Sequence, residues 1–291
     1  MMMISTEIES SANLVGEEKA VEFCAKAGFD AWDFTMSAMC SYNWSTKAFS
    51  LTSHPLAGSQ YLRFARHLRQ IGEDNGIHCN QSHAPHPTFC AGVRDLFKRA
   101  IECTAEAGGT ICVIHPDNYK SAEENAEMYL ELLPFAKSHG VKIATENMYG
   151  WDASLGHGVP HACATPSDFC AHLNAVNDED FVACLDIGHA EMFTPDITAV
   201  KLIYALGDKI QALHIHDNDL LHDSHQIPGS MNVDFVPIIK ALKETNYTGY
   251  FTLEARKFLR AYTEQTVFEG MQALADSAKR LSVLYDNCVI I

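Results

Sequence analysis

Short runs of apolar and β-branched residues alternate along this chain with longer segments whose apolar positions recur at helical spacing. The strand-like runs lie at residues 2–8, 29–35, 77–83, 110–115, 141–146, 181–187, 210–216 and 249–254. The helical patterns lie at 17–27, 59–75, 90–107, 121–138, 165–175, 196–206, 234–245 and 263–284. Eight strand–helix units in succession predict an α/β fold, a single (β/α)8 barrel of the TIM type that takes up residues 1–291 as one domain.

Three of the predicted helices carry start signals in the sequence. Ser121 is followed three residues later by Glu124, which is a capping box: the serine accepts from a first-turn amide and the glutamate reaches back. Thr165-Pro166 and Thr194-Pro195 place a capping threonine before a proline at the first helical position. We therefore expect helices to begin at these points.

Histidine, aspartate and glutamate residues stand at the ends of six of the strand-like runs. They are His83, His115, Glu146, Asp186, His189, His216, Asp223, His225 and Glu254. The carboxyl ends of all strands in a parallel barrel face the same mouth, so these residues should converge there. Three buried carboxylates in one small mouth are costly unless they are paired or bind a metal. We therefore predict a divalent metal site.

The alternation of side chains along the strands supports this arrangement. In residues 211–217, Ala212, His214 and His216 share one face, and large aliphatic residues occupy the other. The aliphatic face suits the helix-covered outside of a barrel, so the ionisable face points inward. His214 lies one residue pair deeper than His216, and we expect it to pack in a barrel layer or behind the ligands. Five other histidines are expected on the surface: His54, His67, His78, His139 and His172.

Composition narrows the class of protein. The net charge of −16 gives a polyanionic partner no general electrostatic help, so no nucleic acid is expected. The ten cysteines contain no CxxC pair, and the first residues have neither a basic start nor a long apolar core. We expect a reduced, cytoplasmic protein without a membrane span, and a homo-oligomer remains open.

Several of these motifs resemble the signature of a known superfamily. Asp186-Ile187-Gly188-His189, His216, Asp223-Ser224-His225 and Glu254 look like those of the xylose-isomerase-like TIM barrels, from the third strand to the eighth. That superfamily includes sugar phosphate isomerases and epimerases, inosose dehydratases and endonuclease IV (AP endonuclease family 2). The motifs are specific to the superfamily, but they do not name a substrate.

The resemblance implies ligands and roles position by position. In the ketose epimerases the metal is held by four residues that match Glu146, Asp186, His216 and Glu254, and the two glutamates also exchange protons with the substrate. The histidine that contacts the sugar there matches His189. In endonuclease IV nine ligands hold three zinc ions, and they match all nine strand-end residues. The cofactor implied is a divalent ion (Zn²⁺, Mn²⁺, Co²⁺ or Mg²⁺), and two or three ions are compatible with this set.

Two features depart from members of that superfamily. Residues 36–58 hold one basic residue, Lys47, where endonuclease IV carries basic and aromatic side chains that wedge into DNA. The loop after the seventh strand reads DNDLLHDSHQIPG and lacks the arginine that the epimerases carry there. Its acidic residues Asp217, Asp219 and Asp223 would also repel a backbone phosphate. DNA and ketose 3-epimerisation in particular are therefore disfavoured.

Residues near the mouth are candidates for contact with a substrate. The loops carry aromatic side chains on which the C–H face of a sugar ring can pack: Trp44, Phe49, Phe89, Tyr149 and Trp151. Arg256, Lys257 and Arg260 are the only cationic cluster near the mouth, which does not decide between a free sugar and a sugar phosphate.

The sequence thus predicts a metal-dependent isomerase or epimerase that moves a proton on a small carbohydrate, a sugar, sugar phosphate or polyol, through an enediolate. Glu146 and Glu254 are the predicted catalytic residues. The predicted substrate-binding residues are His189, His83, Trp151 and Arg256. Two alternatives remain open: a metal-dependent phosphodiesterase like endonuclease IV, and a polyol dehydratase of the inosose type.

Overall fold

Eight parallel strands form a barrel in the computed structural model of the chain, which describes residues 1–193 and 195–289. The strands are β1 (Ile4–Glu7), β2 (Ala31–Thr35), β5 (His78–His83), β6 (Ile111–Val113), β7 (Lys142–Glu146), β10 (Phe181–Asp186), β11 (Ile210–His214) and β12 (Phe251–Leu253). Their order is β11-β10-β7-β6-β5-β2-β1-β12. A parallel bridge between Ile215 and Leu253 joins the two outer strands. The predicted (β/α)8 barrel is confirmed.

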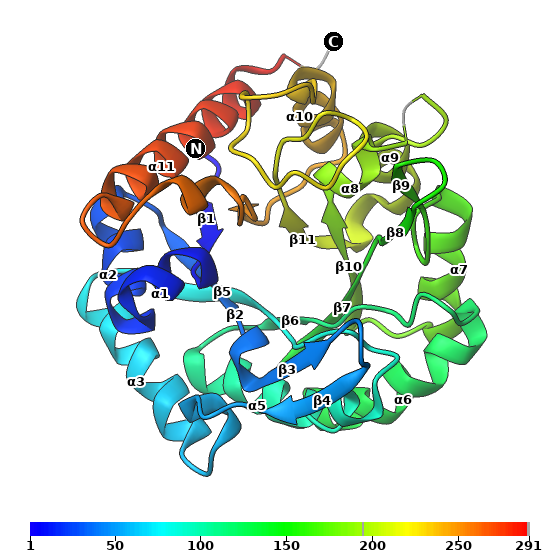
Figure 1. Cartoon of the computed structure of the whole chain (residues 1–291). Helices are drawn as coiled ribbons and strands as arrows, with labels where there is room; N and C mark the ends of the chain where they lie inside the picture. Colours follow the sequence, from blue (N-terminus) through cyan, green and yellow to red (C-terminus); the bar gives the residue numbers. More distant parts are fainter. Residues whose placement is uncertain (194, 290–291) are drawn as a thin grey trace.

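Helices surround the strands on the outside, as Figure 1 shows. The principal helices are α2 (Glu17–Ala27), α3 (Tyr61–Asp74), α5 (Phe97–Ala107), α6 (Ala122–Ser138), α7 (Pro166–Val176), α9 (Ala199–Leu206), α10 (Phe235–Glu244) and α11 (Val267–Asn287). The helix predicted at 90–107 is divided into α4 (Ala91–Arg94) and α5. Among the described helices, none has the length and apolar character that crossing a bilayer requires.

Short elements that the hydrophobic pattern did not predict follow several strands. They are α1 (Glu9–Val15), the hairpin of β3 (Cys40–Asn43) and β4 (Ala48–Leu51), the hairpin of β8 (Tyr149–Asp152) and β9 (His157–Pro160), α8 (Ile187–Glu191), and the 3-10 turns η1 (Ser37–Met39), η2 (Pro55–Ala57), η3 (Gly207–Lys209) and η4 (Phe258–Ala261). Most of them follow the carboxyl end of a barrel strand. They therefore shape the mouth of the barrel.

The helix starts agree with two of the three sequence signals. Ser121 accepts from the backbone N–H of Glu124, whose side chain accepts from the backbone N–H of Ser121, so the capping box is present. Thr165 caps α7 in the same way by accepting from the N–H of Asp168. The cap expected at Thr194 lies outside the described residues, and Thr198 caps α9 instead.

The two faces of the strands pack as their alternation predicts. The small apolar residues Val113, Ala144, Val182, Cys184 and Ala212 form a cluster of their own inside the barrel. Large side chains at alternate positions, such as Leu213 and Phe251, join the principal core that includes the surrounding helices. The inner face is therefore narrow and lined by small residues, and the ionisable side chains lie above this layer at the strand ends.

Candidate active site

The mouth of the barrel contains a cavity of about 440 Å³, which is within the range of small-molecule sites. Seven of the nine predicted ligands line it: His83, His115, Glu146, His189, Asp223, His225 and Glu254. The other two, Asp186 and His216, are fully buried behind them. The nine residues thus come from the carboxyl ends of six of the eight barrel strands, with Asp223 and His225 in the loop after β11.

The deepest group of charged side chains consists of Glu146, Asp186, His214 and Glu254, whose ligand atoms lie within 4.8 Å of one another. His214 Nδ1 lies 3.3 Å from Glu146 Oε1 and 3.9 Å from Glu254 Oε2. Strand register explains this group, because Asp186 is the direct partner of His214 in the pairing of β10 with β11. His214 therefore occupies the level of the carboxylates that we had assigned to His216.

A second group extends this site toward β5 and β6. His83 and His115 approach each other with their Nε2 atoms 2.8 Å apart, and His115 Nε2 lies 3.2 Å from Glu146 Oε2. The other nitrogen of His83, Nδ1, is 2.8 Å from the carbonyl oxygen of Ala84. A hydrogen bond there directs His83 Nε2 toward Glu146, which is how a second partner orients a metal-binding imidazole.

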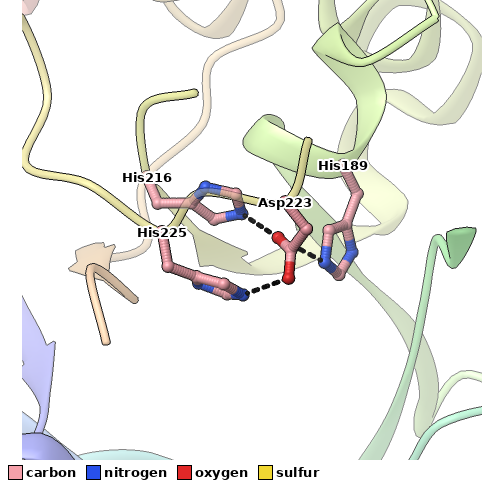
Figure 2. Close-up of side chains that lie close together, drawn as sticks. All are labelled: His189, His216, Asp223 and His225. Atoms are coloured by element: carbon pink, nitrogen blue, oxygen red, sulfur yellow. Dashed lines mark ion pairs between the residues drawn. The ribbon is translucent and has the colours of Figure 1, made fainter. Parts of the chain in front are cut away.

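Three histidines converge on Asp223 on the other side of the mouth, as Figure 2 shows. His225 Nε2 lies 3.0 Å from Asp223 Oδ2, while His189 Nε2 and His216 Nε2 each lie 3.6 Å from Asp223 Oδ1. These four residues form a separate group that could hold a cation. His216 also lies 3.2 Å from Asp186 Oδ1, so Asp186 links this group to the deepest one.

Buried polar atoms without hydrogen bonds point to a missing positive partner. Among the described residues, those that belong to predicted ligands are Glu146 Oε2, Asp186 Oδ2, His216 Nε2 and Asp223 Oδ1. Burial of such atoms is costly unless they are paired or coordinate a metal. Two ligands of one ion at about 2.2 Å lie at most about 4.4 Å apart, which is close to the spacing in these groups. The residues therefore fit one or more divalent cations.

The electrostatic environment keeps the carboxylates in the form that binds cations. Burial by itself would raise the pKa of Glu146, but His214 and His115 hold it well below its usual range. The pKa of Glu254 is lowered against the effect of burial by His214 and Arg256. Burial would likewise lower the pKa of His189, but Asp186, Asp223 and Glu146 raise it to about 10. Cationic side chains thus outweigh the effect of burial on both glutamates.

The connection from β10 to α8 positions two functional side chains, Asp186 and His189, within four residues. Asp186 caps α8 by accepting from the backbone N–H of His189 at 2.7 Å. Asn147 joins the ends of β7 and β10, because its amide donates to the carbonyl of Asp186 and accepts from the Asp186 N–H, both at 2.8 Å. Gly188 lies directly against His216: a Cβ at this position would be 2.1 Å from the imidazole Cε1.

Asp217 holds the first half of the loop after β11 to its second half. Its buried carboxylate accepts from the backbone N–H groups of Asn218, Gly229, Met231 and Val233 at 2.8–3.0 Å. Asp219 instead pairs with His222 at 2.7 Å. Of the three acids expected to repel a phosphate, only Asp223 lines the cavity, so that expectation was wrong for Asp217 and Asp219.

Sequence reasoning missed several residues that serve the site. Asn147 directly follows a predicted ligand, and its position after a strand end was the available signal. Asp33 lies 3.2 Å from His214 Nε2 inside the barrel. Tyr149 was expected only as a surface for a sugar ring, and its hydroxyl also donates to Asp223 Oδ2 at 2.9 Å. The surface assignment of His172 was also wrong: it is buried on α7, 3.2 Å from the amide of Asn125.

Aromatic side chains form the outer rim of the cavity. The lining includes Trp44, Phe89, Tyr149 and Trp151 from the predicted set, and Tyr119 in addition. Phe49 is not part of the lining, because its ring packs against Gly92. Arg256 lines the cavity as well. The predicted substrate-binding residues His83, His189, Trp151 and Arg256 therefore all face the same space.

Comparison with known proteins identifies the family. Residues 21–281 match the description of the xylose isomerase-like TIM barrels. The chain belongs to this family. The match covers every barrel strand except β1 and includes all nine strand-end ligands.

The individual proteins to which this chain is similar share only a low sequence identity with it. An uncharacterised protein of Methanocaldococcus jannaschii is 26% identical over 184 residues, which are 60% of each chain. The chain spans about 60% of the length of the curated relatives it matches. A D-tagatose 3-epimerase-like protein is 21% identical, covering 97% of this chain and 99% of that one with a TM-score of 0.69. An L-ribulose 3-epimerase is 17% identical over 98% and 95%, with a TM-score of 0.70. These likenesses concern the fold.

Proposed function

We propose that this protein is a divalent-metal-dependent isomerase or epimerase acting on a sugar, sugar phosphate or polyol. The observation that carries the proposal is the convergence of Glu146, Asp186, His214 and Glu254 within 4.8 Å beneath a cavity with a polar floor and an aromatic rim. Two glutamates next to a cation-binding set suit proton transfer at a carbon beside a carbonyl. The names of the two solved relatives, both of the 3-epimerase type, agree with this class.

The ligands of the first ion are proposed to be Glu146, Asp186, His216 and Glu254. His214, whose Nδ1 lies 3.3 Å from Glu146 and 3.9 Å from Glu254, is proposed as a positioning residue. His83 with His115, and His189 with Asp223 and His225, are the proposed ligands of a second and third ion. A bound divalent cation would polarise the substrate carbonyl and the adjacent hydroxyl, which lowers the cost of an enediolate.

Glu146 and Glu254 are the proposed proton carriers. They come from β7 and from the end of β12, with β10 and β11 between them, so they reach a bound substrate from different directions. One removes the proton from carbon and the other returns it. Glu146 would hold the ion through one carboxylate oxygen only, which would leave its other oxygen to act on the substrate.

The remaining predicted residues would orient the substrate. His189 and His83 lie at the cavity wall and can hydrogen-bond substrate hydroxyls. Trp151 is 56% exposed at the rim, where its indole face is available to the C–H face of a sugar ring. Arg256 lies 3.9 Å from Glu254 and can contact the substrate next to the proposed base.

The test combines metal analysis with hydrogen exchange from solvent. The purified or reconstituted protein should contain at least one divalent ion per chain, and it should incorporate deuterium from D₂O into at least one ketose, aldose or inosose. The Glu254→Gln substitution keeps the shape of the side chain and removes the base, so exchange should fall by at least about 10²-fold.

Glu269→Gln is the matched control, because Glu269 is an exposed residue of α11 that lines neither of the cavities at the mouth. It should exchange hydrogen as the wild type does. Exchange that persists in Glu254→Gln at the wild-type rate would contradict the role of this glutamate. Metal-loaded protein that exchanges hydrogen into no sugar or polyol of a broad panel would contradict the proposed class of reaction.

The complete set of nine potential ligands favours a second candidate, a phosphodiesterase like endonuclease IV. Its test is cleavage of abasic duplex DNA at several salt concentrations, since binding through phosphates weakens steeply with salt. Efficient cleavage without hydrogen exchange would establish this alternative. Release of water from the substrate in the same panel would instead indicate a polyol dehydratase.

A further inference from the structure

A second cavity of about 410 Å³ lies beside the first at the same mouth. It is bounded by residues that follow β1, β2, β5 and β12, whereas the first cavity lies over the proposed metal ligands. Two side chains, His86 and Arg256, line both cavities. A ligand that occupies the first cavity can therefore extend past Arg256 into the second.

Cationic side chains gather on one wall of this second cavity. Arg256, Lys257 and Arg260 line it together with a single carboxylate, Glu9, so the lining itself has an excess of two positive charges. Of the three cations, Lys257 also lies 3.8 Å from Asp223, outside the lining. This excess is local, since the whole chain carries a net charge of −16. A phosphate would therefore be attracted only by these nearby cationic side chains, because the negative net charge of the whole protein repels it.

Arg256 has hydrogen-bonding capacity to spare. Its guanidinium lies 3.7 Å from Glu9 and 3.9 Å from Glu254, and it forms no side-chain hydrogen bond among the described residues. Glu9 is itself bonded to Ser37. Arg260 is exposed and pairs with no carboxylate of the described chain. Guanidinium groups bind phosphate oxygens through two parallel hydrogen bonds, a geometry that both arginines can offer.

We infer that the second cavity binds a phosphate group of the substrate. The inference deepens the proposed function and rests on it: the substrate would be a phosphorylated sugar or polyol, with its reacting carbons over Glu146 and Glu254 and its phosphate against Arg256 and Arg260. A phosphate ester carries a charge between about −1.5 and −2 at neutral pH, which matches the local excess of positive charge.

Inorganic phosphate is the first probe, measured by isothermal titration calorimetry on the wild type and two variants. Arg260→Ala should weaken phosphate binding at least about fivefold, because a charge-assisted hydrogen bond is lost. Arg63→Ala is the matched control: Arg63 is an exposed residue of α3 that lines neither cavity, and the loss of charge is the same. Equal weakening in both variants, or in neither, would overturn the inference.

The proposed metal ligands are a competing site for phosphate, and dialysis against a chelator separates the two. Binding that survives chelation and is weakened by Arg260→Ala supports the second cavity. Binding that disappears after chelation and is unaffected by Arg260→Ala would locate the phosphate at the metals and overturn the inference.

The second probe is a pair of substrates with and without phosphate. In the exchange assay, Arg260→Ala should raise KM for the phosphorylated sugar and leave kcat nearly unchanged, since the contact is made equally in ground and transition states. Exchange into neutral sugars alone, without phosphate binding, would overturn the subsite and leave the proposed function standing. Phosphate binding that depends on Arg260, without exchange into any sugar, would overturn the function and leave the subsite standing.

Discussion

At the scale of single residues, the site depends on close contacts between side chains and backbone. Asp186 is both a candidate ligand and the cap of α8, so its carboxylate is held in place by the backbone N–H of His189. Asn147 fixes the neighbouring strand end through two hydrogen bonds. Because a ligand set must be held within about 0.5 Å of its working geometry, such supporting contacts decide metal affinity.

Gly188 gives the sharpest prediction at this scale. In Gly188→Ala the new Cβ would lie 2.1 Å from His216, so the imidazole must move away from Asp186 and Asp223. We expect at least about 10-fold weaker binding of the ion held by His216, since displaced supporting contacts commonly cost 10–100-fold in affinity. Competition with a fluorescent chelator measures this.

Gly58→Ala is the control for that substitution. A Cβ at Gly58 meets only the carbonyl oxygen of Pro55 at 3.6 Å, an ordinary contact. Its metal affinity should equal that of the wild type. Unchanged affinity in Gly188→Ala would mean that His216 is not a ligand.

At the scale of elements, short segments after the strands carry the function and the barrel supports them. The β3–β4 and β8–β9 hairpins bring Trp44, Tyr149 and Trp151 to the rim of the first cavity. The loop after β11 brings Asp223 and His225 back over the strand ends. His225 has a φ of 42°, and its Nδ1 lies 2.6 Å from the carbonyl oxygen of Glu254, so this loop is fastened to the end of β12.

Asp217 is the residue on which the order of that loop depends. Asp217→Ala would leave four backbone N–H groups without their acceptor, two of them buried and two partly buried. Each unsatisfied buried group costs about 1–3 kcal/mol, so we expect the free energy of unfolding to fall by at least about 2 kcal/mol. Metal bound at Asp223 and His225 should be lost at the same time. Urea unfolding and metal analysis are the measurements.

Asp219→Ala is the control in the same loop, because Asp219 is partly exposed and bonds mainly to His222 and neighbouring backbone. We expect a loss of less than about 1 kcal/mol, as for other exposed ion pairs. If the two variants lose equal stability and equal metal, the loop is not organised by Asp217.

At the scale of the whole molecule, stability should depend on pH through a buried acid next to the mouth. Burial raises the pKa of Glu7 to about 7, against the effects of Ser10 and Arg256, while Glu9 raises it slightly further. The folded protein therefore binds a proton more tightly than the unfolded chain, whose glutamate has a pKa near 4.5. The stabilisation is fully present below pH 4.5 and is lost as the pH rises through about 7.

Glu7→Gln removes this dependence, since glutamine has no proton to lose. Relative to the wild type, the variant should gain up to about 3 kcal/mol in free energy of unfolding between pH 5 and pH 8.5. Chemical denaturation at both pH values measures the difference, with Glu269→Gln as an exposed control. A stability difference that is the same at both pH values would show that Glu7 does not titrate in this range.

Much of this protein followed from local patterns in the sequence. Eight strand–helix units and the alternation along each strand determined the barrel and the inward direction of Glu146, Asp186, His216 and Glu254. The convergence of the strand-end ligands on one mouth followed from the sequence as well. All strands of a parallel barrel end at the same mouth, whatever their exact register. Caps at Ser121 and Thr165 are equally local, since donor and acceptor lie within three residues.

Register and loop paths were decided only by the tertiary structure. Asp186 is level with His214 and Glu146 is level with Cys184, so depth in the barrel separates His214 from His216 although both share one face of β11. Which ligands share a group therefore depends on hydrogen bonding between strands far apart in sequence. The mouth holds two cavities that share Arg256, and the shape of the second one depends on where the segments after β1, β2 and β12 meet. No periodicity along the chain encodes such contacts, because they are set by packing between segments and not by neighbours in sequence.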